Sequence, residues 1–221
     1  MSTPENATNG RRSFYLYTRY ERFWHWFQAL LIILLLLTGF EVHGSISLLG
    51  FEQAVTVHNF LGLTWLIAFA FFVFWVFTTG EWKQYVPTTK MMFEVMAYYG
   101  YGIFAGQPHP CPKRPDAKHN PLQRMTYLSL AAVLLPFQMV TGLLYYLYNS
   151  WTEMGITGLS LEVVAVAHLI GAFAILLFLI VHVYMTTTGH TIFAHIKAMF
   201  TGVEEVEHAS EVADWEKKTP A

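Results

Sequence analysis

The distribution of apolar and charged residues along the chain predicts four long helices. Four stretches contain no Asp, Glu, Lys or Arg: residues 23–40, 53–80, 125–152 and 163–196. Each is at least as long as the roughly 18 apolar residues that indicate a membrane-spanning helix. We therefore predict an all-α membrane protein whose transmembrane domain, residues 23–196, is a four-helix bundle. Its spans are expected at about residues 23–42, 54–80, 125–148 and 161–187.

Three segments lie outside these spans. Residues 1–22 read as a polar N-terminal segment, and residues 197–221 as an acidic, solvated tail that includes Glu204. The connection between spans two and three contains an apolar and aromatic stretch, Lys90 to Tyr101, that glycines end too soon for another crossing. We interpret this stretch as an interfacial amphipathic helix, with an ordinary surface loop as the alternative. Pro136 should kink the third span.

Composition agrees with residence in a membrane and excludes some other classes of protein. The 221 residues are 54% hydrophobic and only 13% charged, and a soluble fold of this length could not bury so much apolar surface alone. The net charge of −2 argues against a nucleic-acid partner. Cys111 is the only cysteine, so a disulfide within the chain and a C-x-x-C-H haem attachment are both excluded.

The basic residues predict the orientation. With four spans, all 13 Lys and Arg fall on one side, and the two loops on the other side carry none. By the positive-inside rule this side is the cytoplasm, so both termini are expected there. The basic residues are Arg11, Arg12, Arg19 and Arg22 before span one, Lys83, Lys90, Lys113, Arg114, Lys118 and Arg124 between spans two and three, and Lys197, Lys217 and Lys218 after span four.

Four histidines lie within the apolar stretches: His25, His58, His168 and His182. Ionisable groups inside a bilayer are costly, and they indicate functional sites. His168 and His182 are 14 residues apart, nearly four whole turns. They should therefore share one face of span four at depths that differ by roughly 21 Å. From the predicted orientation, His25 and His182 lie near the cytoplasmic surface, and His58 and His168 lie in the outer half.

Two histidine pairs at matched depths predict two non-covalent haem b groups, each iron held by two imidazoles. The inner pair is His25 with His182, and the outer pair is His58 with His168. A single histidine could instead hydrogen-bond to a neighbouring helix. His43, five whole turns after His25, is an alternative outer ligand. Three glycines would leave room for the outer porphyrin: Gly39, Gly62 and Gly171.

Polar residues near the predicted inner pair suit a quinone, whose oxygens need hydrogen bonds and whose reduction needs protons. The candidates are Asn120, Gln123, Arg124 and His190. The alternative is that Asn120 only caps span three and that Arg124 binds a lipid phosphate or a haem propionate.

The order of these motifs resembles a known family. The motifs are Trp24-His25-Trp26, Val57-His58-Asn59, a third span without histidine, and His168 with His182 on span four. Their order is similar to that of the dihaem cytochrome b subunits of bacterial respiratory complexes. These include the formate dehydrogenase gamma subunit and the cytochromes b of nickel-iron hydrogenase and thiosulfate reductase. The resemblance extends from Arg19 to Gly202. It implies the same ligand pairs, a quinone site near the inner haem, and an extracytoplasmic redox partner.

Iron held by two histidines has no open position for a substrate, so such a haem carries electrons. We therefore expect a multi-pass subunit of the bacterial inner membrane. Its expected role is to transfer electrons between menaquinone or ubiquinone and an extracytoplasmic iron–sulfur or multihaem oxidoreductase subunit. Two alternatives remain at this point: a self-contained superoxide:quinone-type oxidoreductase, and a non-haem membrane transporter or scaffold. The absence of basic residues from the outer loops counts against an anionic substrate such as superoxide.

Overall fold

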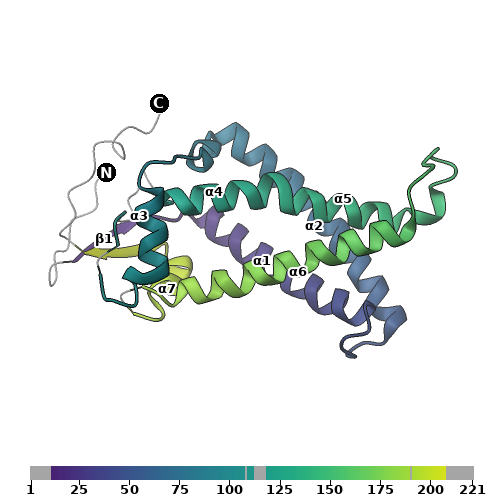
Figure 1. Ribbon diagram of the computed structural model, residues 1–221, viewed down its shortest axis with the longest axis horizontal. Helices are drawn as coiled ribbons and strands as arrows, with labels where there is room; N and C mark the ends of the chain where they lie inside the picture. The colour runs from purple at the N-terminus through teal and green to yellow at the C-terminus, as the bar shows by residue number, and fades with distance from the viewer. Residues whose placement is uncertain (1–10, 108, 112–117, 190, 208–221) are drawn as a thin grey trace. The chain divides into compact units, whose positions relative to one another are not determined.

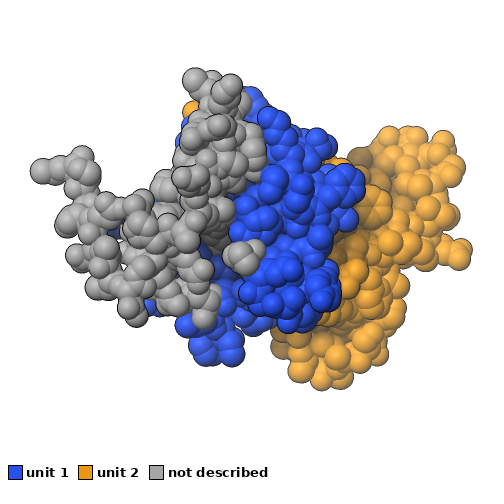
Figure 2. Space-filling model, turned by 60° about the vertical axis from the view of Figure 1, so that its left-hand side comes forward, with its two compact units in different colours: residues 1–23, 79–128, 182–221 blue, residues 24–78, 129–181 orange. Residues whose placement is uncertain are grey.

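The computed structural model describes residues 11–107, 109–111, 118–189 and 191–207. The described chain is mostly helical, with a short two-stranded sheet (Figure 1). It divides into two compact units (Figure 2). Unit 1 comprises residues 1–23, 79–128 and 182–221, and unit 2 comprises residues 24–78 and 129–181. Each unit is described by itself.

Four helices are long and apolar enough to cross a membrane, as predicted. They are α1 (Arg19–Val42), α2 (Phe51–Thr79), the combined segment Pro121–Tyr146, and α6 (Leu161–Thr186). The first three begin three or four residues before the predicted starts. The prediction used charge-free stretches, whereas a helix can begin with polar or charged residues that also satisfy its free backbone N–H groups.

The start of α1 shows this effect in unit 1. The backbone N–H of Thr18 donates to Glu21 Oε2 (2.8 Å), and the N–H of Glu21 donates to Thr18 Oγ1 (3.2 Å). This reciprocal pair is a capping box. The other carboxylate oxygen of Glu21 accepts a hydrogen bond from Lys118 Nζ at 2.6 Å, and the Lys118 side chain is buried. One carboxylate thus both caps α1 and binds the segment before the third span.

The third span is not a single regular helix. It consists of α4 (Pro121–Ser129), a π-helical turn at Leu130–Leu134, and α5 (Leu135–Tyr146). In the π-helical turn the N–H of Leu135 donates to the carbonyl of Leu130, five residues earlier. Pro136 follows at once and has no N–H to donate. The ladder is thus irregular at the place where the sequence predicted a kink, and the irregularity takes the form of a π turn.

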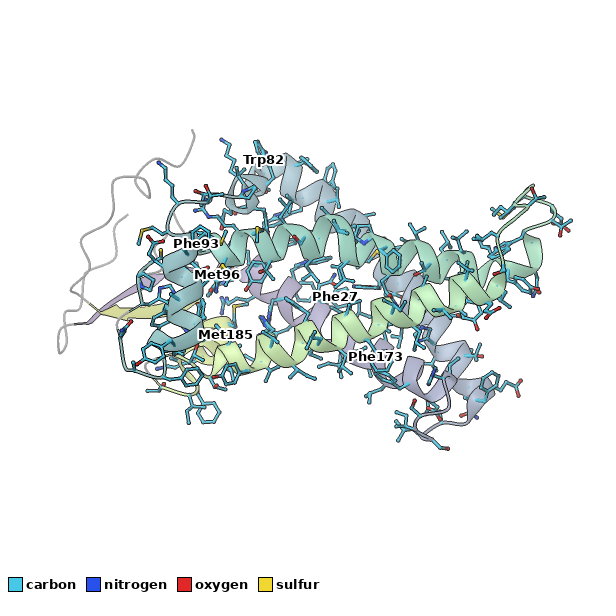
Figure 3. All side chains as sticks on the ribbon, in the orientation of Figure 1. Phe27, Trp82, Phe93, Met96, Phe173 and Met185 are labelled. Atoms are coloured by element: carbon cyan, nitrogen blue, oxygen red, sulfur yellow. The ribbon has the colours of Figure 1, made fainter. Side chains whose placement is uncertain are left out.

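The core of unit 2 is apolar and draws on all four spans. Its buried residues are Leu31, Leu61, Trp65, Ala68, Leu135, Met139 and Ile175. Phe27 packs against this cluster, and Figure 3 labels it together with Phe173. A polar contact lies among these apolar residues, where Trp65 Nε1 donates to Gln28 Oε1 of α1 at 2.7 Å.

Unit 1 contains a feature that the apolar pattern did not indicate. Strand β1 (Arg11–Tyr15) pairs antiparallel with β2 (Val203–Glu207), with Arg11 opposite Glu207 and Tyr15 opposite Val203. Helix α7 (Ala194–Thr201) precedes β2 and ends at Gly202, which has a φ of 85°. A Cβ at Gly202 would lie 2.7 Å from the carbonyl oxygen of Tyr17, so this turn requires glycine.

The prediction of a fully solvated acidic tail was wrong for Glu204. Its side chain is 4% exposed, and Glu204 Oε1 lies 2.8 Å from His195 Nδ1. Charge patterning alone could not reveal this pairing, because the burial of Glu204 follows from the sheet and from α7.

A helix lies where the interfacial segment was predicted. It is α3 (Met92–Ala97), continued by a π-helical turn at Tyr98–Gly102. Met92 and Val95 are buried, whereas Phe93 is 80% and Met96 is 51% exposed; Figure 3 labels the last two. Exposed aromatic and thioether side chains on a short amphipathic helix suit the headgroup region. Its position at the membrane surface stays a prediction.

Candidate functional site

Two of the predicted histidines face each other in unit 2. His58 lies in the second turn of α2, and His168 lies in the second turn of α6. Their ring centroids are 6.3 Å apart, and the ring planes are inclined at 88°. Two imidazoles from different helices thus lie near each other within the apolar spans, and their role as the outer ligand pair stays a prediction.

Each of these histidines makes a hydrogen bond to a threonine on a neighbouring helix. His58 Nδ1 lies 2.9 Å from Thr38 Oγ1 of α1, and His168 Nδ1 lies 3.1 Å from Thr141 Oγ1 of α5. Both threonines are buried. In both rings the contact uses Nδ1, which leaves Nε2 as the nitrogen directed away from the threonine.

A glycine follows each threonine and lets the histidine approach closely. A Cβ at Gly39 would lie 3.1 Å from His58 Cε1, and a Cβ at Gly142 would lie 3.0 Å from His168 Cε1. Gly39 thus accommodates the histidine ring itself, and the room that it leaves for a porphyrin stays a prediction. Gly62 has no atom near its missing side chain, and a Cβ at Gly171 would collide with the Gln138 amide.

Gln138 of α5 also contacts this pair. It is 7% exposed, and its Nε2 lies 3.2 Å from Nε2 of His168. An amide N–H₂ group in this place donates to a lone pair on His168 Nε2, which corresponds to the tautomer with its proton on Nδ1. A metal would bind through that same lone pair, and Gln138 would then have to release it.

The outer pair fits an iron porphyrin. The two imidazoles come from different helices with their ring centroids 6.3 Å apart, so they would hold one iron between them. The donors are neutral imidazoles in an apolar surrounding, which is the ligand set of a b-type haem. The residues present therefore suit the group that the sequence predicted.

The remaining predicted ligands belong to different parts of the chain. His25 lies in unit 2, whereas His182 is the first residue of the last segment of unit 1, so their pairing stays a prediction. His43, the alternative outer ligand, follows the end of α1, is exposed, and its Nδ1 lies 2.9 Å from Ser45 Oγ.

The predicted quinone residues that the structure describes lie in unit 1. Asn120 and Gln123 form a second capping box: the N–H of Gln123 donates to Asn120 Oδ1 (2.8 Å), and the N–H of Asn120 donates to Gln123 Oε1 (3.0 Å). Pro121 occupies the first helical position, where no donor is needed. The capping role considered for Asn120 is thus present. Arg124 Nε donates to the carbonyl of His119 (3.1 Å), and His190 lies outside the described residues.

Asn120 also takes part in a buried polar network. Its Nδ2 donates to the hydroxyl of Tyr99 (3.1 Å), which in turn lies 3.1 Å from His109 Nε2. The backbone N–H of Cys111 donates to His109 Nδ1 (2.9 Å), so in the neutral ring Nε2 carries the proton and donates to Tyr99. Burial raises the pKa of Tyr99 to about 12, so its hydroxyl stays protonated at neutral pH.

Sequence reasoning missed four residues of these two sites: Thr38, Thr141, Gln138 and Tyr99. The first three share one signal that could have revealed them, because each is a polar residue inside an otherwise apolar span. The positions of Thr38 and Thr141 along their spans correspond to the same depth as His58 and His168.

Comparison with known proteins identifies the family. A family model described as prokaryotic cytochrome b561 matches residues 16–202. The chain belongs to this family. The predicted resemblance to bacterial respiratory cytochromes b is therefore confirmed. With its four apolar helices, the chain is a multi-pass membrane cytochrome b of electron transfer that binds haem b. The alternative of a non-haem transporter or scaffold is thereby excluded.

Named relatives agree with this assignment. The chain is 32% identical over 203 residues to the putative cytochrome YdhU of Escherichia coli K12, covering 90% of this chain and 77% of that protein. It is 26% identical to probable Ni/Fe-hydrogenase B-type cytochrome subunits of two other bacteria. The match with Rhodobacter capsulatus covers 79% of this chain and 74% of that protein, and the match with Rhizobium leguminosarum bv. viciae covers 79% and 81%. No solved structure matches the chain.

Proposed function

We propose that the chain is a dihaem cytochrome b that carries electrons between the quinone pool and an extracytoplasmic redox subunit. The observation that carries this proposal is the approach of His58 and His168, whose ring centroids are 6.3 Å apart inside the spans. Haem b held by two imidazoles supplies a one-electron carrier with no open position for a substrate. The protein's part is to hold the ligands at defined depths and to exclude water.

The outer haem is assigned to His58 and His168, and the inner haem to His25 and His182. Support for the inner pair comes from α6, which runs unbroken as an α-helix from Leu161 to Thr186 and carries both His168 and His182. Fourteen residues of regular helix put these two side chains on one face, roughly 21 Å apart along the axis. The exposed position of His43 and its contact with Ser45 favour His58 as the outer ligand.

A quinone site on the cytoplasmic side is assigned to Asn120, Gln123, Arg124 and His190. The buried network from Asn120 through Tyr99 to His109 supports this assignment. A quinone that is reduced must take up protons, and a series of hydroxyl, amide and imidazole groups can deliver them. Menaquinone and ubiquinone present the same two carbonyl oxygens to these groups.

The partner is proposed to be an iron–sulfur or multihaem subunit that docks on the outer face. The loops there, residues 43–50 and 147–160, are short, and neither contains Lys or Arg. They carry exposed apolar side chains, of which Leu48 and Met154 are 65% and 55% exposed. Loops of this size have no room for a redox centre of their own. Two relatives are named as hydrogenase subunits, which supports a partner of the oxidoreductase class.

Haem analysis of the purified protein tests the proposal. A pyridine haemochrome assay should give two haem b per polypeptide. His58→Ala should lower this number to one, because the outer iron would lose one of its two ligands, and His43→Ala should leave two. A single haem in the fully loaded wild-type protein, or loss of a haem in His43→Ala alone, would contradict the assignment.

A further inference from the structure

The two outer histidines are held by the same local arrangement, used twice. A Thr-Gly dipeptide on one helix contacts the histidine on the next helix along the chain: Thr38-Gly39 of α1 contacts His58 of α2, and Thr141-Gly142 of α5 contacts His168 of α6. In both cases the hydroxyl meets Nδ1, and the glycine lies against Cε1. In both helix pairs the histidine thus has the same two neighbours, a threonine hydroxyl at Nδ1 and a glycine at Cε1.

The direction of these hydrogen bonds follows from the backbone. Thr38 Oγ1 donates to the carbonyl of Leu34 (2.8 Å), and Thr141 Oγ1 donates to the carbonyl of Phe137 (2.9 Å). A hydroxyl has a single proton, so toward the histidine each threonine can only accept. Nδ1 of both histidines must therefore carry the proton, and Nε2 must carry the lone pair. The contact between Gln138 Nε2 and His168 Nε2 is compatible with this tautomer.

A hydrogen bond from a threonine hydroxyl to its own helix does not by itself explain the contact with a histidine. Thr56, Thr64 and Thr78 of α2 donate to their own helix in the same way. Among the described contacts, none of these three meets a histidine. The contact with an imidazole distinguishes Thr38 and Thr141 from these three threonines.

We propose that Thr38 and Thr141 are positioning residues that fix the tautomer of the outer haem ligands and set the potential of that haem. This inference rests on the ligation by His58 and His168 proposed above. A histidine whose Nδ1–H donates to an acceptor is a more basic ligand through Nε2. A more basic ligand stabilises ferric iron relative to ferrous iron, so the two threonines lower the midpoint potential. The glycines allow the approach on which both bonds depend.

The test uses substitutions that separate the hydroxyl from the shape of the side chain. Thr38→Val and Thr141→Val remove the acceptor and keep the branching, whereas Thr38→Ser and Thr141→Ser keep the acceptor. Thr64→Val is the matched control, because it removes a back-bonded hydroxyl from α2 without a histidine contact. Haem number is measured by pyridine haemochrome and the potentials by redox titration. The outer haem is identified by comparison with His58→Ala.

We expect both valine variants to raise the midpoint potential of the outer haem and to leave that of the inner haem unchanged. Release of the outer haem to a haem acceptor should become about tenfold faster, as for other lost contacts to a metal ligand. The serine variants and Thr64→Val should match the wild type. Loss of the outer haem in a valine variant but not in the matching serine variant would also support the proposal.

Unchanged outer-haem potentials in both valine variants, with two haems bound, would overturn the inference and leave the proposed function standing. Equal loss of haem in the serine and valine variants would also overturn it, because packing and not the hydroxyl would then be responsible. A wild-type protein with fewer than two haems would instead contradict the proposed function.

Discussion

At the residue scale, Asn120 has two contacts that a single substitution would remove together. Its Oδ1 caps α4, and its Nδ2 donates to Tyr99. Asn120→Ser keeps an oxygen that can cap the helix but removes the amide N–H₂ group. The pair Asn120→Ala and Asn120→Ser therefore separates the cap from the polar network.

We expect both Asn120 variants to slow haem reduction by menadiol or decylubiquinol about tenfold, which corresponds to one lost hydrogen bond of about 1.4 kcal/mol. Both should retain the haem content of the wild type. The measurement is stopped-flow absorbance of the reduced haem, with Asn149→Ala on the exposed outer loop as the control. Wild-type rates in Asn120→Ser together with slow rates in Asn120→Ala would assign the effect to the cap and place the quinone elsewhere.

The sequence could indicate a functional residue where an ionisable side chain lies in an apolar span, because such a side chain is costly in a membrane. His58 and His168 could be paired by depth alone, because an imidazole in an apolar span is rare. Thr38 and Thr141 could not be recognised in this way, since a threonine can satisfy its hydroxyl on its own helix. Only the packing of α1 against α2 and of α5 against α6 shows that these two oxygens also accept from histidine.

At the element scale, the helix starts depend on a few carboxylate and amide groups. Glu21 closes the capping box of α1 and also pairs with the buried Lys118. Glu41 has a comparable role before α2, since its Oε1 accepts the N–H groups of Leu48, Leu49 and Gly50 at 2.6–2.8 Å. These contacts involve polar and charged residues at the ends of the spans, so charge-free stretches located the spans but not their first turns.

We predict that Glu21→Ala lowers the free energy of unfolding by about 3 kcal/mol, because Lys118 would stay buried without its carboxylate and α1 would lose its cap. Thermal unfolding in detergent measures the change. Glu52→Ala removes an exposed carboxylate from the first turn of α2 and should change stability by less than about 0.5 kcal/mol.

The double variant Glu21→Ala/Lys118→Met separates the two contributions of Glu21. It should recover part of the lost free energy of unfolding, because methionine is apolar and leaves no unpaired charge in the buried site. A double variant less stable than Glu21→Ala would show that Lys118 has other partners of greater importance.

Other elements lay beyond what the apolar pattern could predict. Pro136 indicated an irregularity in the third span, but not that a π-helical turn at Leu130–Leu134 would absorb it. The strands β1 and β2 are short and lie at opposite ends of the sequence. Their formation depends on pairing between distant segments, which the local pattern of apolar residues cannot predict.

At the scale of the whole molecule, the terminal strands bear on the topology. β1 precedes the first span and β2 follows the fourth, and they form one antiparallel sheet within unit 1. Such a sheet requires both ends to lie on the same side of a membrane, as an even number of spans also demands. The positive-inside rule, applied to the 13 basic residues, predicts that this side is the cytoplasm.

Cysteine labelling in spheroplasts tests the predicted orientation, in a Cys111→Ala background that removes the native thiol. Ser47→Cys and Thr152→Cys lie on the two loops that are predicted to face outward, and Thr89→Cys lies between the second and third spans; all three positions are exposed. A membrane-impermeant maleimide should label the first two directly and Thr89→Cys only after lysis. Labelling of Thr89→Cys in intact spheroplasts would reverse the orientation and move the proposed quinone site to the outer side.

The pairing of β1 with β2 also determines the order in which the protein can be completed during synthesis. Roughly 200 residues separate the two strands. At about 5–20 residues per second, the ribosome needs roughly 10–40 s to make that length. Throughout this interval all four spans can emerge and insert while β1 has no strand to pair with. The sheet therefore closes after the bundle, and a nascent chain that stops before Val203 would have its spans but never this sheet.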